Sequence, residues 1–144
     1  MPREPWKVSR EMFLAEPEVD RLRAHLAARE RAALDDGGRA TAATDRLIIE
    51  TLLFSGLRNS EFCNLRVEDT IVGLKASALR VLETPRQNRL VHVPDAVSDL
   101  IRRYCRETRP GLAPPGVSPA DRRQPLVFNE RGKGAAMFGH VMQR

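Results

Sequence analysis

The amino-acid sequence predicts an α+β domain that is mainly helical and contains a small three-stranded antiparallel sheet. Apolar residues recur at helical intervals over residues 45–55, and such spacing is typical of a helix with one buried face. Short runs that are typical of strands follow over residues 70–73, 78–83 and 89–93. With 144 residues, the chain fits one domain with a modest core.

The first half of the chain is predicted to be helical, after a polar lead-in over residues 1–12. Gly56 is expected to end the second helix, because only glycine enters the left-handed backbone conformation without steric cost. Asn59 or Ser60 can then cap a short third helix over residues 59–65, with Glu61 in its first turn. The first two helices cover residues 16–34 and 39–55 and are separated by a break at Asp35, Asp36, Gly37 and Gly38.

The second half begins with the three strands and continues into a helix that Pro94 and Asp95 open and that Arg109 and Pro110 close. Residues 110–125 carry several prolines and glycines, so they are predicted to form a loop. A short strand and a last helix are expected at residues 126–128 and from about residue 135.

Arg58 is the first candidate for chemistry, because it lies in the short connection between two anchored helices. A guanidinium is planar, always charged and presents paired donors that match phosphate oxygens. The alternative is a structural role, in which Arg58 bonds the last carbonyls of the preceding helix or pairs with Glu61. The residues alone leave both interpretations open.

The run Gly56-Leu57-Arg58-x-Ser60-Glu61, followed by Asn64-Leu65, resembles the first arginine box of the tyrosine recombinases, the phage integrase and Xer-like family. Further segments are similar to that family's catalytic domain, and their order is more persuasive than any single motif. They are its opening at residues 13–22, its β-hairpin at residues 81–94 and its Leu-Phe-x-x-x-x-Gly segment at residues 126–132. The resemblance implies a partial catalytic domain over residues 13–144 behind a linker over residues 1–12.

The resemblance implies DNA integration or recombination, with strand cleavage and rejoining through a 3′-phosphotyrosyl intermediate. Arg58 would be a catalytic arginine that neutralises charge on the phosphate, and Glu61 would support its geometry. Lys75, Arg86 and Arg89 are candidate DNA-binding residues, with solvated turn charges as the alternative. The implied partner is double-stranded DNA, a homo-oligomer on DNA is left open, and no metal, cofactor or small-molecule substrate is implied.

The chain departs from the family pattern at residues that carry the chemistry. No His-x-x-Arg box and no late nucleophilic tyrosine occur in these 144 residues, and Thr84 stands where the family has its hairpin lysine. Tyr104, the only tyrosine, shares helical spacing with Val97 and Ile101 and is predicted to be a core residue. We therefore expect a truncated recombinase that is inactive alone, and whether it is an enzyme stays open. The alternatives are a non-catalytic DNA-binding or regulatory remnant and an unrelated helical interaction domain.

The composition suits a nucleic-acid partner without identifying one. The formal net charge is +5, and only three of the 24 basic residues are lysines. The charge is spread along the chain, which predicts weak and strongly salt-dependent nonspecific binding of DNA. Cys63 and Cys105 are expected to be buried or partly buried thiols. The absence of a signal-peptide pattern and of a long apolar run predicts a cytoplasmic protein.

Overall fold

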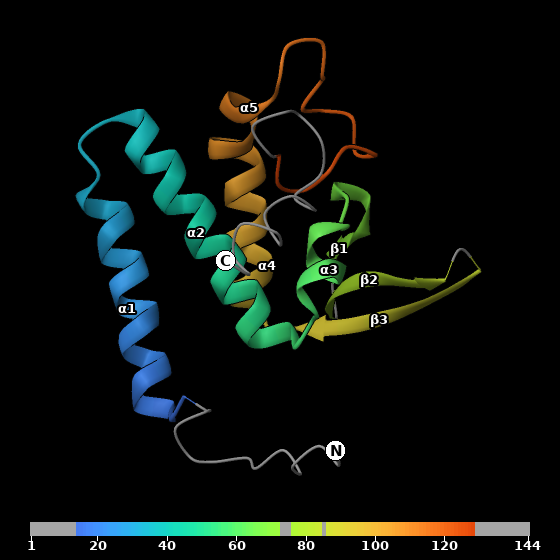
Figure 1. The fold of residues 1–144 in the computed structure, drawn as a ribbon, viewed down its shortest axis with the longest axis horizontal. Coiled ribbons are helices and arrows are strands. Elements are labelled where there is room, and N and C mark those ends of the chain that lie inside the picture. The colour runs from blue at the N-terminus through green and yellow to red at the C-terminus, as the bar shows by residue number, and fades with distance from the viewer. Residues whose placement is uncertain (1–13, 73–75, 85, 129–144) are drawn as a thin grey trace, which may run out of the picture.

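The fold is mainly helical with a small antiparallel sheet, as predicted (Figure 1). The structure is a computed structural model that describes residues 14–72, 76–84 and 86–128. The predicted lead-in and the predicted helix from residue 135 lie outside the described residues. The elements in chain order are α1 (Glu16–Ala32), α2 (Asp36–Ser55), α3 (Asn59–Cys63), η2 (Val67–Asp69), β1 (Thr70–Val72), β2 (Ser77–Thr84), β3 (Gln87–Val93), α4 (Asp95–Arg103), the π-helical segment η3 (Tyr104–Thr108) and α5 (Arg109–Leu112).

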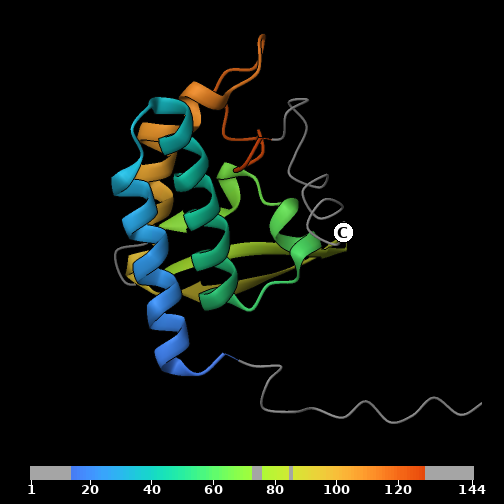
Figure 2. The same cartoon turned by 60° about the vertical axis from the view of Figure 1, so that its left-hand side comes forward.

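Helices α1 and α2 lie side by side, and α4 also packs against α2 (Figures 1 and 2). A break separates the two helices, as predicted, but it lies at residues 33–35 rather than 35–38, because α1 ends at Ala32 and α2 already begins at Asp36. Asp35 explains the difference, since its carboxylate accepts a hydrogen bond from the Gly38 N–H and so caps the helix ahead of the two glycines. The connection between α1 and α2 is therefore shorter than the sequence indicated.

A network of ion pairs fastens α1 and α4 to α2. Glu50 of α2 is only 4% exposed, and its carboxylate binds Arg23 of α1 at 2.7 Å and Arg46 at 2.9 Å. Glu30 of α1 binds both Arg46 and Arg103, each at 3.1 Å. Because buried Glu50 and half-buried Glu30 each have two guanidinium partners, the cost of removing their charges from water is offset.

The sheet has the strand order β1-β2-β3 and is antiparallel throughout. Its main part is the β2–β3 hairpin, paired from Ser77 opposite Val93 to Thr84 opposite Gln87, and β1 adds three residue pairs along β2. Side chains alternate between the two faces of a strand. Leu79 and Val81 accordingly lie in the core, while Arg80 belongs to the opposite face of β2.

One hydrophobic core joins the helices to the sheet. Leu47 of α2 is fully buried, and Leu79 of β2 is 1% exposed. The core therefore fixes α3 and the start of the hairpin against the long helices. Its other buried members are Ala43, Ile48, Leu57, Phe62, Cys63, Leu65, Val81, Val93, Val97, Leu100, Ile101, Tyr104, Leu126 and Val127.

The chain after α4 differs from the prediction in two ways. The helix does not close at Arg109 and Pro110, because α5 carries the helical turn on to Leu112. Pro110 fits there, since the first turn of a helix needs no N–H from it. Residues 126–128 are buried but form no strand among the described residues. The Arg109 guanidinium occupies the carbonyls of Pro125 and Leu126 that a strand would use.

Over residues 14–72, 76–84 and 86–128, no helix combines the length and the apolar character needed to cross a membrane.

Candidate functional site

The end of α2 sets the position of Arg58. Gly56 adopts the left-handed conformation with φ of 66° and ends the helix, as predicted. The next residue, Leu57, is buried in the core. Arg58 then stands at the N-cap position of α3, so the prediction that Asn59 or Ser60 caps this helix is wrong. The cap comes from inside the helix instead, because the Arg58 N–H donates to Glu61 Oε1 at 2.9 Å.

Glu61 is the centre of the contacts around the start of α3. Its carboxylate accepts two hydrogen bonds from the Arg89 guanidinium of β3, at 2.7 Å and 3.2 Å. The bonds from Arg89 and from the Arg58 N–H lower the pKa of Glu61 to about 2. Arg89 also donates to Glu83 of β2 at 2.8 Å. The short helix is thus tied directly to the hairpin.

The side chain of Arg58 is left available by this arrangement. Glu61 binds the backbone of Arg58 rather than its guanidinium. Within the part of the chain that the structure describes, the guanidinium makes no hydrogen bond and no ion pair, and Arg58 is exposed. The structural role that the sequence left open, a side-chain pair with Glu61, is therefore taken by Arg89.

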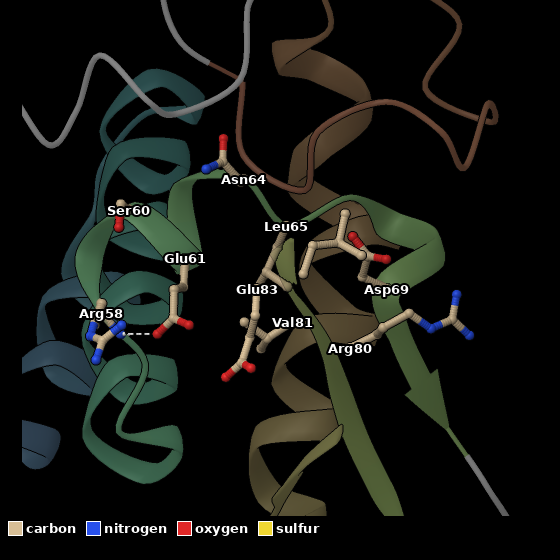
Figure 3. A pocket seen from close by; sticks show the side chains of 10 residues that line it. Arg58, Ser60, Glu61, Asn64, Leu65, Asp69, Arg80, Val81 and Glu83 are labelled. Atoms are coloured by element: carbon tan, nitrogen blue, oxygen red, sulfur yellow. Dashed lines mark hydrogen bonds between the residues drawn. The ribbon is translucent and has the colours of Figure 1, made fainter. Parts of the chain in front are cut away.

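Arg58 lines an open pocket of about 470 Å³ between α3 and β2 (Figure 3). Asp69, on its wall, is itself occupied, because its carboxylate accepts a hydrogen bond from the Arg66 N–H at 2.9 Å. Arg89 pairs with two of the three carboxylates in the lining, Glu61 and Glu83, while Arg58 and Arg80 form no ion pair among the described residues. The lining residues are Arg58, Ser60, Glu61, Asn64, Leu65, Asp69, Arg80, Val81, Leu82 and Glu83.

The other predicted DNA-binding residues are placed differently from one another. Arg89 is engaged by Glu61 and Glu83, so its guanidinium serves the architecture of the site. Arg86 is exposed in the hairpin turn and does not line the pocket, and Lys75 lies outside the described residues. The structure thus brings Arg58, Glu61 and Arg89 together and leaves Arg86 apart.

Thr84 has a structural role where the family pattern has a lysine. Its hydroxyl accepts hydrogen bonds from the Arg86 N–H at 3.3 Å and the Gln87 N–H at 3.0 Å. These bonds close the hairpin turn in the manner of a Ser/Thr turn motif. Thr84 therefore closes the turn and does not supply the ammonium group that a lysine would bring to this position.

Arg80 lines the pocket and was missed by the reasoning from sequence. The signal available was the alternation of β2, in which buried Leu79 and Val81 place Arg80 on the opposite face. The alternation does not predict which element the Arg80 face of β2 contacts, because that contact depends on how the hairpin packs against α3.

Tyr104 is a core residue, as predicted, with 3% of its surface exposed. Its hydroxyl lies 3.2 Å from Thr44 Oγ1, and burial raises its pKa. Cys63 is buried and Cys105 half-buried, as predicted. Among the described residues, no group of three or more His, Cys, Asp or Glu side chains could hold a metal ion.

Comparison with known sequences places these features in a family. The model of the phage integrase family matches residues 13–135. Tyrosine recombinase XerC of Mycobacterium sp. (strain KMS) is 33% identical over 96 residues, which make up 67% of this chain and 30% of that protein. XerC of Mycobacterium leprae (strain TN) is 31% identical over a stretch of the same length. The chain spans about 30% of the length of the curated relatives it matches.

Solved structures share the fold at low sequence identity. The crystal structure of XerH site-specific recombinase bound to difH substrate, a pre-cleavage complex, matches with a TM-score of 0.62 and 18% identity. The match covers 84% of this chain and 31% of that one. The crystal structure of XerA recombinase matches 99% of this chain and 42% of its own, with a TM-score of 0.59 and 19% identity.

Proposed function

Because the chain belongs to the phage integrase family of tyrosine recombinases, we propose that it is part of a site-specific DNA recombinase and supplies the arginine that binds the reacting phosphate. Residues 13–144 then form part of the catalytic domain and residues 1–12 the linker before it. The start of the family match at residue 13 supports this division. An unrelated helical interaction domain, the second alternative from the sequence, is excluded by the family match.

The observation that carries the proposal is the state of Arg58. Its backbone is fixed by Gly56 on one side and Glu61 on the other, while its guanidinium faces the pocket without a hydrogen bond to any described residue (Figure 3). A guanidinium that is held at its base and free at its tip is ready for a phosphate. The ion pair of Glu61 with Arg89 supports this role, because it keeps the nearest carboxylate from competing for Arg58.

The chemistry proposed for Arg58 is electrostatic. When a phosphodiester is attacked, negative charge builds up on its nonbridging oxygens, and a prepositioned guanidinium lowers the energy of that state. Arg58 remains protonated throughout, because a guanidinium does not give up its proton near neutral pH. The attacking and proton-transferring groups would have to come from elsewhere, since Tyr104 is buried and Thr84 closes the hairpin turn.

The first test replaces Arg58 with glutamine and measures binding to a fluorescein-labelled DNA duplex by anisotropy over a series of NaCl concentrations. We expect affinity at low salt to fall by roughly threefold to tenfold, and the slope of log affinity against log salt to shrink by about one. Arg31→Gln is the matched control, because Arg31 is exposed near the end of α1, across the molecule from the hairpin (Figure 1). Equal binding by Arg58→Gln and Arg31→Gln would contradict the proposal.

A second candidate function, DNA binding without strand cleavage, is favoured by the positions of Thr84 and Tyr104. The 144-residue polypeptide is expected to form no covalent adduct with a nicked DNA duplex, because its only tyrosine is in the core. The measurement is denaturing gel electrophoresis after incubation with a suicide substrate. A protein–DNA band that disappears in Tyr104→Phe would show that Tyr104 can react after all.

A further inference from the structure

The pocket holds a second arginine whose guanidinium has no partner. Arg80 lies on β2, lines the same pocket as Arg58, and is half-buried. Over the described residues, Arg80 makes no side-chain hydrogen bond, ion pair or cation–π contact. Arg89, beside the pocket, is paired with Glu61 and Glu83, whereas the guanidinium of Arg80 has no such pair among the described residues and can take an external ligand.

The carboxylates near Arg80 are already engaged by other groups. Asp69 accepts a hydrogen bond from the Arg66 N–H, and Glu61 and Glu83 both bind Arg89. None of the three forms an ion pair with Arg80 in the described part of the chain. Arg58 and Arg80 therefore border the pocket without an ion pair in the described part of the chain, and Arg80 does so from the face of β2 opposite the one that meets Glu61.

The two arginines come from different elements and lie at opposite ends of the pocket. Arg58 extends from the start of α3, and Arg80 extends from β2 beyond Asp69 (Figure 3). A phosphate held by one guanidinium therefore leaves the other to a neighbouring anionic group. Leu82 also lines the pocket and is 58% exposed. An apolar side chain in this place suits the sugar of a nucleic-acid strand rather than a second charge.

We infer that Arg80 binds a second backbone phosphate of the DNA strand whose first phosphate is held by Arg58, so that the pocket takes a phosphate–sugar–phosphate unit. The inference rests on the proposed function, because it assumes that DNA enters the pocket. It assigns Arg80 to positioning the strand along the pocket rather than to the reaction itself. Contacts to phosphates fix the register of a nucleic acid on a protein without reading its sequence.

The experiment compares Arg80→Gln, Arg58→Gln and the double variant in the same salt-dependent anisotropy assay. Each single change is expected to weaken duplex binding at low salt by roughly threefold to tenfold and to reduce the salt slope by about 0.9, with twice that reduction in the double variant. Arg80→Lys should keep the wild-type slope, because it keeps the charge. Its recovery would show that the loss in Arg80→Gln does not come from unfolding, and Arg31→Gln again serves as the control.

The outcomes separate the inference from the proposed function. If Arg58→Gln weakens binding and Arg80→Gln behaves like Arg31→Gln, the second phosphate contact is wrong and the proposed function stands. If neither change exceeds the control, both are wrong. Loss of DNA binding in Arg80→Gln alone would overturn the shared pocket.

To exclude binding of a single free phosphate, the assay is repeated with inorganic phosphate in place of sodium chloride at equal ionic strength. If phosphate weakens DNA binding more than chloride does, and by the same factor in the wild type and in Arg80→Gln, the assignment of Arg80 to the strand is overturned.

Discussion

Replacing Arg109 with leucine is expected to lower the free energy of unfolding by about 3 kcal/mol. Arg109 is only 1% exposed, and its guanidinium donates to the carbonyls of Pro119, Pro125 and Leu126 at 2.7–3.1 Å. Its Cζ atom also lies 4.3 Å from the centre of the Phe128 ring. Leucine would fill the space but leave these carbonyls without their donor. Urea unfolding followed by circular dichroism measures the change.

Arg109→Lys is the informative control for this prediction. Lysine keeps the positive charge but replaces the planar fork with a single ammonium group, which cannot serve three carbonyls in the same geometry. We expect an intermediate loss of stability. If Arg109→Leu were as stable as the wild type, the cost of burying the guanidinium would equal what its hydrogen bonds return. That cost is real here, because burial lowers the pKa of Arg109.

The effect of Arg109 should extend to the pocket through the backbone. The segment that Arg109 holds pairs with the chain after α3, since the Leu126 N–H donates to the Leu65 carbonyl at 2.9 Å. The Val67 and Glu68 N–H groups donate to the carbonyls of residues 124 and 122 at 3.2 Å and 2.8 Å. Leu65 lines the pocket. Loss of Arg109 is therefore expected to speed hydrogen exchange at the Leu126 amide as well.

Local signals were enough to predict the position of Arg58. Gly56 has a distinct backbone requirement, and the apolar residues before it have helical spacing, so the end of α2 and the exposed arginine after it could be inferred from sequence. The cap of α3 could not be assigned from the sequence. Several neighbouring residues can cap a helix, and Glu61 does so by reaching back to the Arg58 N–H.

Contacts between distant parts of the chain could not be predicted. Arg109 and Pro110 look like the end of a helix, and only the folded chain shows that the guanidinium meets carbonyls 10–17 residues further on. Arg80 and Arg89 both looked like strand or turn charges. Hairpin register makes the difference between them, because Val81 and Arg89 are paired on the face toward α3, where Glu61 lies.

The pH dependence of stability is expected to follow Glu61. The Arg89 bonds and the Arg58 N–H lower its pKa from 4.5 to about 2. A carboxylate with a lowered pKa stabilises the fold above its unfolded pKa, and this contribution is lost as the pH falls through the folded pKa. The free energy of unfolding should therefore decline from about pH 4.5 toward pH 2. Asp121 adds to the same decline, because its bonds to Arg123 lower its pKa to about 2 as well.

Glu61→Gln separates the two carboxylates. At pH 7 the variant should be less stable than the wild type, since it loses the charged partner of Arg89. Near pH 2 the difference should be much smaller, because the pH has then fallen to the folded-state pKa of Glu61 and most of the stability from its lowered pKa is lost. Urea unfolding at several pH values measures both, and Asp121→Asn shows how much of the slope belongs to the distant carboxylate. An equal loss at pH 7 and pH 2 would mean that the shape of Glu61, not its charge, holds α3 to the hairpin.

A second substitution at Glu61, Glu61→Ala, tests how Arg58 is kept available for DNA. In Glu61→Ala the Arg58 N–H loses its acceptor, which alone costs about 1 kcal/mol, and among the described residues Arg89 keeps only Glu83 as an ion-pair partner. Arg58 then loses the contact that fixes its backbone, so DNA binding should weaken even though a negative charge has been removed from the pocket. If charge alone governed binding, Glu61→Ala would bind DNA more tightly than the wild type. The direction of that one change therefore decides between a positioning role for Glu61 and a purely electrostatic one.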